Sequence, residues 1–228
     1  MHKMKIYKIL LGLFYLTPLF VNANDTGGVS LAPTRVILNE GKTSSIQFNN
    51  KTNEDLLLRA WISGYNKSDK SKDFVISPPL YRIKSNENIQ FRINLLNGEL
   101  PRDRESVFHI NVLSIPPMVN DSQLQFAINS RVKLFYRPHK IAEKYNDEQI
   151  ISGLSVVGSN SKVIIKNPSD FHITLDSVMV NNQRITSTID FMIAPHSDIH
   201  IPFKNPKVIS YRVIKDNGSK TKEIIKNI

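Results

Sequence analysis

The segment Leu124-Gln-Phe-Ala-Ile-Asn-Ser-Arg-Val-Lys-Leu-Phe-Tyr-Arg-Pro138 alternates between apolar and polar residues over most of its length. Leu124, Phe126 and Ile128 share one parity, and the same parity stays mostly apolar further on, although Ser130 interrupts it. A period of two residues is typical of a β-strand with one apolar and one polar face. On its pattern alone, the segment is predicted to be an ordinary core strand.

Lys133 lies in the same segment but on the opposite parity from Leu124. Side chains of opposite parity point to opposite faces of a strand. If Leu124 and Lys133 must face one cleft, a bulge between Ile128 and Lys133 has to change the register.

Length and composition limit the class of protein. The chain has 228 residues, which suits one large domain or two domains of about 100 residues. A hydrophobic content of 40% is enough for buried cores and argues against a disordered chain. The sequence has no cysteine, which excludes disulfides, cysteine-based metal sites and a cysteine nucleophile.

The N-terminus has the organisation of a signal peptide. A basic start precedes a largely apolar stretch, and Val21-Asn-Ala23 offers a small-residue cleavage site, so residues 1–23 are predicted to be removed. A membrane anchor is a weaker alternative, because Pro18 interrupts the apolar stretch. The signal contains three lysines and no acidic residue, so its removal lowers the formal charge from +10 to +7. The remaining basic residues are scattered, and we expect no nucleic acid partner.

Short apolar runs separated by Gly, Pro and Asn follow the signal peptide, and none has sustained helical periodicity. Such spacing predicts an all-β sandwich fold. The predicted strands cover 29–37, 44–48, 56–62, 74–76, 80–83, 89–95, 107–115, 124–138, 150–157, 162–166, 172–180, 199–203 and 208–214. A polar stretch predicts a linker at 139–147, between an N-terminal domain at 24–138 and a C-terminal domain at 148–228. Trp61, the only tryptophan, is expected in a buried strand.

Several ordered motifs resemble one known family. They are Val29-Ser-Leu-Ala-Pro-Thr-Arg35, Ser77-Pro-Pro-Leu-Tyr-Arg82, Leu100-Pro-Arg-Asp-Arg-Glu-Ser-Val-Phe108, Asn111-Val112, Ile115-Pro-Pro117, Arg131-Val-Lys-Leu-Phe-Tyr-Arg-Pro138, Lys166-Asn-Pro-Ser169 and Ala194-Pro195. Together they resemble the periplasmic pilus (fimbrial) chaperones of the chaperone–usher system, over essentially the whole mature chain.

The resemblance implies two immunoglobulin-like β-sandwich domains in an L-shaped, boomerang arrangement. It also implies that the protein is a periplasmic chaperone, which binds, stabilises and caps pilus subunits by donor-strand complementation and delivers them to an outer-membrane usher. The partners implied are pilin subunits and the usher. No cofactor is implied.

The resemblance also assigns roles to particular residues. Leu124, Phe126 and Ile128 match the donor-strand anchors that enter the groove of the subunit. Arg35 and Lys133 match the basic pair that holds the C-terminal carboxylate of the pilin. Without the resemblance, both cations would be taken as ordinary surface residues of strands.

A second set of matched residues lies near the linker. Glu105, Arg137 and Asp216 fall where the family places ion pairs between its two domains. For Asp216, which precedes a turn at Asn217-Gly218, an ordinary surface position is an equal alternative.

Loop lengths point to one class within the family. Only eight residues separate Ile115 from Leu124, and five residues lie between the predicted cleavage site and the first strand. Both lengths, like the lack of cysteine, resemble the short-loop class. Because an apolar edge strand risks self-association, we expect a capped dimer or a disordered loop before Leu124 when no subunit is bound.

The sequence contains no convincing catalytic constellation, and we predict that the protein is not an enzyme. His196-Ser-Asp198 has the residue types of a hydrolase triad, but adjacent residues in a turn cannot converge as a triad does. His196 and His200 lack further ligands at suitable spacing, so no metal site is predicted. The alternative function is a secreted structural or adhesive β-sandwich, pilin-like or carbohydrate-binding.

Overall fold

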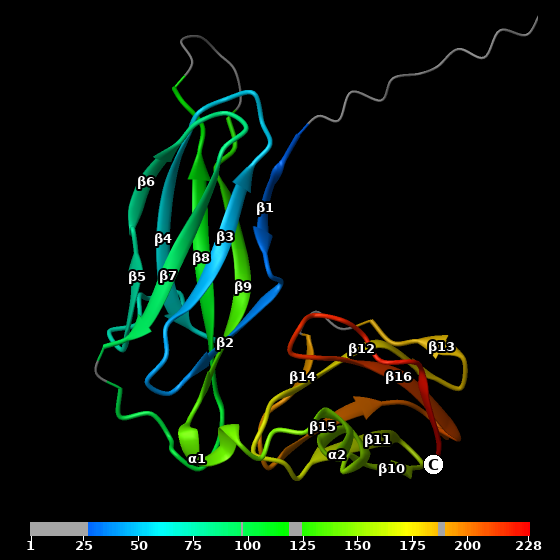
Figure 1. Ribbon diagram of the computed structural model, residues 1–228. Helices are drawn as coiled ribbons and strands as arrows, with labels where there is room; N and C mark the ends of the chain where they lie inside the picture. Colours follow the sequence, from blue (N-terminus) through cyan, green and yellow to red (C-terminus); the bar gives the residue numbers. More distant parts are fainter. Residues whose placement is uncertain (1–26, 97, 119–124, 187–189) are drawn as a thin grey trace, which may run out of the picture.

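The structure is a computed structural model that describes residues 27–96, 98–118, 125–186 and 190–228. The predicted signal peptide, Leu124 and most of the loop before it therefore lie outside the described residues. The chain forms two domains built almost entirely of β-strands, which confirms the predicted all-β fold class. In Figure 1 the C-terminal domain lies across the lower end of the upright N-terminal domain, so that the two form an L.

The N-terminal domain is a sandwich of two sheets (Figure 1). The first sheet has the order β1 (Val29–Ala32), β3 (Ser44–Asn50), β7 (Asn88–Leu95) and β5 (Phe74–Ser77). The second has the order β2 (Arg35–Asn39), β9 (Ile128–Arg137), β8 (Ser106–Ile115), β4 (Leu56–Gly64) and β6 (Leu80–Ile83).

Alternating residues of both sheets fill the core of this sandwich. In β4, for example, Leu58 and Ile62 are buried. Trp61 lies on the opposite parity and is only partly buried, with the Arg59 guanidinium 5.5 Å from its ring centroid. The strand that contains Trp61 is buried on one face, as expected, but Trp61 itself lies on the other face, because in a two-sheet sandwich only one face of each strand meets the core.

The N-terminal extended run is split between the two sheets. Residues 29–37 were predicted as an extended run punctuated by Pro33, and in the structure β1 pairs with β3 in one sheet and β2 pairs with β9 in the other. The chain crosses between sheets at Pro33, which has no N–H group to continue a ladder. This crossing places Arg35 at the start of β2.

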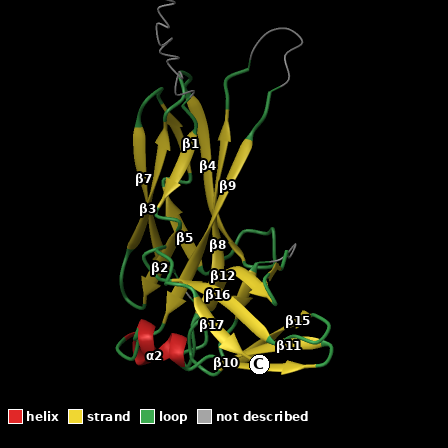
Figure 2. Cartoon of the chain, turned by 90° about the vertical axis from the view of Figure 1, so that its right-hand side faces the viewer, coloured by secondary structure: helices red, strands yellow, loops and turns green. Residues whose placement is uncertain are grey.

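Strand β9 pairs with β8 without any shift in register, from Ser106 opposite Tyr136 to Ser114 opposite Ile128. The ladder therefore has no bulge between Ile128 and Lys133, where the sequence required one only if Leu124 and Lys133 face the same cleft. Figure 2 shows the two strands side by side along the length of the domain. The strand starts at Ile128, later than the sequence pattern suggested.

Two short helices follow β9, namely α1 (His139–Ala142) and α2 (Asp147–Ser152). The prediction of a strand at 150–157 was wrong in its first half, because α2 runs to Ser152 and β10 begins only at Ser155. The side chain of Asn146 caps α2 by accepting a hydrogen bond of 3.0 Å from the backbone N–H of Gln149. Two acidic residues in the first turn also favour a helix here.

The C-terminal domain is a second, smaller sandwich with its own core. One sheet has the order β10 (Ser155–Ser159), β11 (Lys162–Asn167) and β15 (Ser197–Pro202). The other has the order β13 (Gln183–Arg184), β12 (Ile173–Val180), β16 (Val208–Ile214) and β17 (Ile224–Asn227), and β14 (Phe191–Ile193) also pairs with β12. The sequence analysis missed the short strands β13, β14 and β17, which have too few residues to show a period. Among the described residues, no helix has the length and apolar character needed to span a membrane.

Candidate functional site

Strand β9 uses its two faces for different purposes. The face that carries Leu134 and Tyr136 is buried in the core of the N-terminal domain. The other face carries Lys133, Phe135 and Arg137, and all three side chains approach the C-terminal domain. Because side chains alternate along a strand, residues 133–137 contribute both to the core of the N-terminal domain and to its contact with the C-terminal domain.

The upper half of β9 has an open edge. On one side β8 pairs with residues 128–136 of the strand, but on the other side β2 pairs only with residues 133–137. In the described part of the chain, no strand pairs with the outer edge of Ile128–Val132. The side chains at this end are unusually exposed for their size: Phe126 is 70% exposed and Ile128 is 53% exposed. Free backbone groups beside exposed apolar side chains make this edge a template for another strand.

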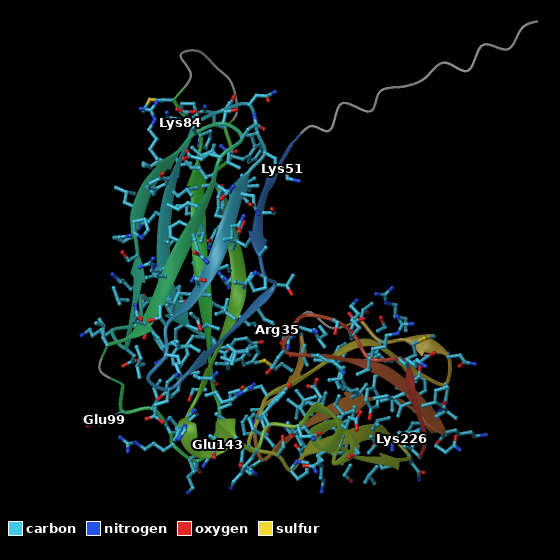
Figure 3. All side chains as sticks on the ribbon, viewed as in Figure 1. Arg35, Lys51, Lys84, Glu99, Glu143 and Lys226 are labelled. Carbon is cyan, nitrogen blue, oxygen red and sulfur yellow. The ribbon has the colours of Figure 1, made fainter. Side chains whose placement is uncertain are left out.

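Arg35 and Lys133 lie next to each other where the open edge ends. They are direct partners in the parallel ladder of β2 and β9, so their side chains leave the sheet on the same face. Figure 3 shows Arg35 at the junction between the two domains. Its guanidinium donates a hydrogen bond of 3.1 Å to the carbonyl oxygen of Ile214 and lies 5.5 Å from the Phe135 ring centroid. Burial lowers the pKa of Arg35 from its ordinary value, although an arginine remains charged.

Lys133 forms an ion pair with Asp190, which belongs to the C-terminal domain. The other carboxylate oxygen of Asp190 accepts a hydrogen bond of 2.5 Å from the hydroxyl of Tyr65. Partial burial raises the pKa of Asp190, but the hydrogen bonds from Lys133 and Tyr65 outweigh it and the net shift is downward. The carboxylate is therefore ionised at neutral pH, and it faces a cleft of about 870 Å³ that both domains line.

A second charged group holds the domains together below the cleft. Arg137 bonds Glu105 at 2.8 Å and 3.2 Å and Asp216 at 2.8 Å, so the three predicted ion-pair residues do meet. The side chains of Arg137 and Glu105 are 6% and 2% exposed. Glu105 also accepts hydrogen bonds from the backbone N–H of His172 and lies 3.1 Å from its Nδ1 atom. Burial opposes the charge on Arg137, but its bonds with Asp216 and Glu105 outweigh this and raise its pKa.

Two family models match the chain. The description "Pili and flagellar-assembly chaperone, PapD N-terminal domain" matches residues 28–142, and "Pili assembly chaperone PapD, C-terminal domain" matches residues 149–225. The chain belongs to the PapD-like pilus chaperones.

Individual members of the PapD-like family are similar over most of their length. The chaperone protein LpfB of Salmonella typhimurium is 34% identical over 85% of this chain and 86% of its own. The SafB chaperone of Salmonella enterica, solved in complex with the SafA pilin, gives a TM-score of 0.80 at 28% identity, over 88% of this chain and 96% of that chain. The periplasmic chaperone SfaE gives a TM-score of 0.75 at 30% identity, over 88% of this chain and 100% of that chain.

Of the site residues predicted from the PapD-like motifs, Arg35 and Lys133 are adjacent, and Phe126 and Ile128 lie further up the same edge. The sequence analysis did not find Asp190, Tyr65 or His172. No local signal could have identified them. Their contacts join segments 57 to 125 residues apart, which only the assembled fold brings together.

The histidines considered for catalysis or metal binding lie away from this cleft. The Nε2 atom of His196 is 2.9 Å from an oxygen of Asp170, and that of His200 is 3.5 Å from Asp198. Across the ranges that the structure describes, no group of three or more potential ligands is arranged to hold a metal ion.

Proposed function

We propose that this protein is a periplasmic chaperone that binds and caps pilus subunits and passes them to an outer-membrane usher. One observation carries the proposal: the open edge of β9 ends at the two adjacent cations Arg35 and Lys133, where β2 begins. Family membership supports it, since SafB is a chaperone bound to a pilin and SfaE is named as periplasmic.

The mode of binding would be strand addition. Chaperone–pilin donor-strand complementation is an established example of this mode, in which backbone hydrogen bonds give affinity and alternate side chains fill pockets. Here the subunit would pair along Ile128–Val132, and Phe126 and Ile128, with Leu124 before them, would fill its groove. Each such side chain contributes about 1.5 to 3 kcal/mol when it is fully buried.

Arg35 and Lys133 would hold the C-terminal carboxylate of the subunit. A strand added along the open edge has to stop where β2 occupies that edge, and its terminal carboxylate would then lie in the plane of the sheet beside both cations. Donor side chains and cations can therefore sit on opposite parities, and no bulge is required. Charge-assisted hydrogen bonds of this kind contribute about 1.5 to 3 kcal/mol each.

The buried ion pairs of Arg137 with Glu105 and Asp216 would fix the angle between the domains, and thereby the shape of the cleft. We further propose that the chain acts by binding and not by catalysis, and that it belongs to the short-loop class. The alternative of a secreted structural or adhesive sandwich is not favoured by the family to which the chain belongs.

The proposal is tested by co-expressing the chain with a pilin encoded beside it and purifying the pair from the periplasm. A stable one-to-one complex is expected. Recovery of the pilin in equal amount without the chaperone would contradict the proposed function.

Phe126→Ala should lower the affinity for the pilin by about 10- to 100-fold, because a fully buried aromatic side chain is lost from the complex. The melting temperature of the free chaperone should not change, since Phe126 is 70% exposed there. Leu80→Ala is a matched control, because Leu80 is 58% exposed on β6, away from the open edge. Equal losses of affinity for both variants would argue against a donor role for Phe126.

A further inference from the structure

Asp190 places a carboxylate on Lys133 from the far side of the cleft. Lys133 belongs to β9 of the N-terminal domain, whereas Asp190 directly precedes β14, which is held in the C-terminal domain by its pairing with β12. One oxygen of Asp190 contacts the Lys133 ammonium, and the other accepts the hydrogen bond from Tyr65. Both carboxylate oxygens of Asp190 therefore bond to side chains of the N-terminal domain.

The position of this carboxylate is held by more than one contact. The Tyr65 ring stacks on His109 with centroids 4.8 Å apart, and the Lys133 ammonium lies 5.8 Å from the centroid of the same ring. Lys133 is only 16% exposed and Asp190 is 37% exposed, so water screens the pair less than it screens a surface ion pair. Burial and the hydrogen bond to Asp190 also raise the pKa of Tyr65, which keeps its hydroxyl protonated as a donor.

We propose that Asp190 is an affinity-determining residue: an internal carboxylate that occupies Lys133 in the free chaperone and competes with the C-terminal carboxylate of the subunit. The inference rests on the proposed function. Within the described residues no carboxylate pairs with Arg35, whose guanidinium donates its hydrogen bond to the neutral carbonyl oxygen of Ile214. The two cations of the anchor therefore differ: one is open to a carboxylate and the other is already paired with one.

The competition has a simple physical basis. Two carboxylates that share one ammonium repel each other, so an incoming carboxylate must displace Asp190 or bind more weakly beside it. The apparent dissociation constant then rises by the inverse of the fraction of molecules in which Lys133 is free. A terminal carboxylate on a peptide that does not pair with β9 has too little binding free energy to displace Asp190. A subunit that also pairs along β9 has additional binding free energy from that pairing.

Asp190→Asn tests the competition, because asparagine keeps the size of the side chain and an acceptor for Tyr65 but removes the charge. The probe is a synthetic peptide with the sequence of the C-terminal strand of the pilin, prepared once with a free carboxylate and once with a carboxamide. We expect Asp190→Asn to tighten binding of the carboxylate peptide by about three- to tenfold and to leave the carboxamide peptide unchanged. The gain should vanish in a Lys133→Met background.

Asp198→Asn is the matched control, since Asp198 is 43% exposed in the same domain and pairs with His200 instead of Lys133. It should not change the affinity of either peptide. Tyr65→Phe should act in the same direction as Asp190→Asn but more weakly, because it frees one oxygen of Asp190 and keeps the ring. Weaker binding of the carboxylate peptide to Asp190→Asn would overturn the proposal and would make Asp190 a residue that orients Lys133 for the subunit.

A second measurement needs no subunit at all. The rate at which acetic anhydride labels Lys133, followed by mass spectrometry, should rise several-fold in Asp190→Asn, while the exposed Lys84 reacts at an unchanged rate. An unchanged rate at Lys133 would overturn the contact itself. If the contact is confirmed but the wild-type chaperone binds neither the pilin nor its peptide, the proposed function fails and the competition with it.

Discussion

Lys133→Met should reduce the affinity for a pilin by about 30- to several thousand-fold, because removing one partner of a desolvated charge pair costs about 2 to 5 kcal/mol. The subunit carboxylate would then lie next to Arg35 alone, in the cleft that both domains line. The apolar stem of methionine retains most of the packing of the lysine side chain, so the effect reports the charge. Arg35→Met should act in the same direction.

Affinity is best measured by titrating the purified chaperone against refolded pilin, with recovery of the complex from the periplasm as a second measure. Lys84→Met provides the matched control, since Lys84 is an exposed lysine at the far end of the N-terminal domain (Figure 3). A Lys133→Met variant that binds pilin as tightly as Lys84→Met would remove the anchor from the proposed mechanism. The free variant should also unfold at nearly the same denaturant concentration as the wild type, because the Asp190 carboxylate is 37% exposed and water can solvate it when the ammonium is lost.

Arg137→Met should have the largest effect on folding, with a loss of about 3 to 5 kcal/mol in the free energy of unfolding. Glu105 is 2% exposed and would keep its charge without its cation, and Asp216 would lose the same partner. Part of the loss would come from the Tyr145 and Phe171 rings, whose centroids lie 4.1 Å and 5.0 Å from the guanidinium carbon. Urea unfolding monitored by far-UV circular dichroism measures the change.

Arg104→Met is a close comparison for this variant. Arg104 also pairs with a carboxylate at 2.8 Å, but its side chain is 46% exposed and that of its partner Asp103 is 55% exposed. Its loss should change the free energy of unfolding far less than Arg137→Met does, because water screens an exposed ion pair. The double variant Glu105→Gln/Arg137→Met should recover part of the stability, because no unpaired charge remains buried. If Arg104→Met and Arg137→Met were equally destabilising, burial would not be the reason for the effect.

Much of the fold could be predicted from the sequence because the pattern that indicates a strand lies within a few consecutive residues. The alternation in β4, β8 and β9 and the turns between them are properties of a few neighbouring residues. The motifs also singled out Arg35 and Lys133, which the structure places in register, and the three members of the Arg137 group, which it brings within bonding distance.

The incorrect predictions have two kinds of cause: some segments suit more than one secondary structure, and some contacts join residues that are far apart in the sequence. The helix α2 was taken for a strand because Ile150 and Ile151 suit either element, and the cap at Asn146 decided the outcome. A bulge in β9 was required only on the condition that Leu124 and Lys133 face one cleft, and the ladder with β8 runs on without one. Asp190 and Tyr65 could not be foreseen, since their hydrogen bond links residues 125 positions apart in different domains.

The unbroken pairing of β8 with β9 also limits how the chaperone can adapt to different cargo. Sliding β9 by a single position would turn Lys133, Phe135 and Arg137 into the sandwich interior and expel Leu134 and Tyr136. The register of β9 is therefore fixed on both faces. Apolar packing in the sandwich core holds one face, and ion pairs with the C-terminal domain hold the other. Since β9 cannot shift its register, we expect subunits whose terminal strands differ in length to adjust their own conformation when they bind.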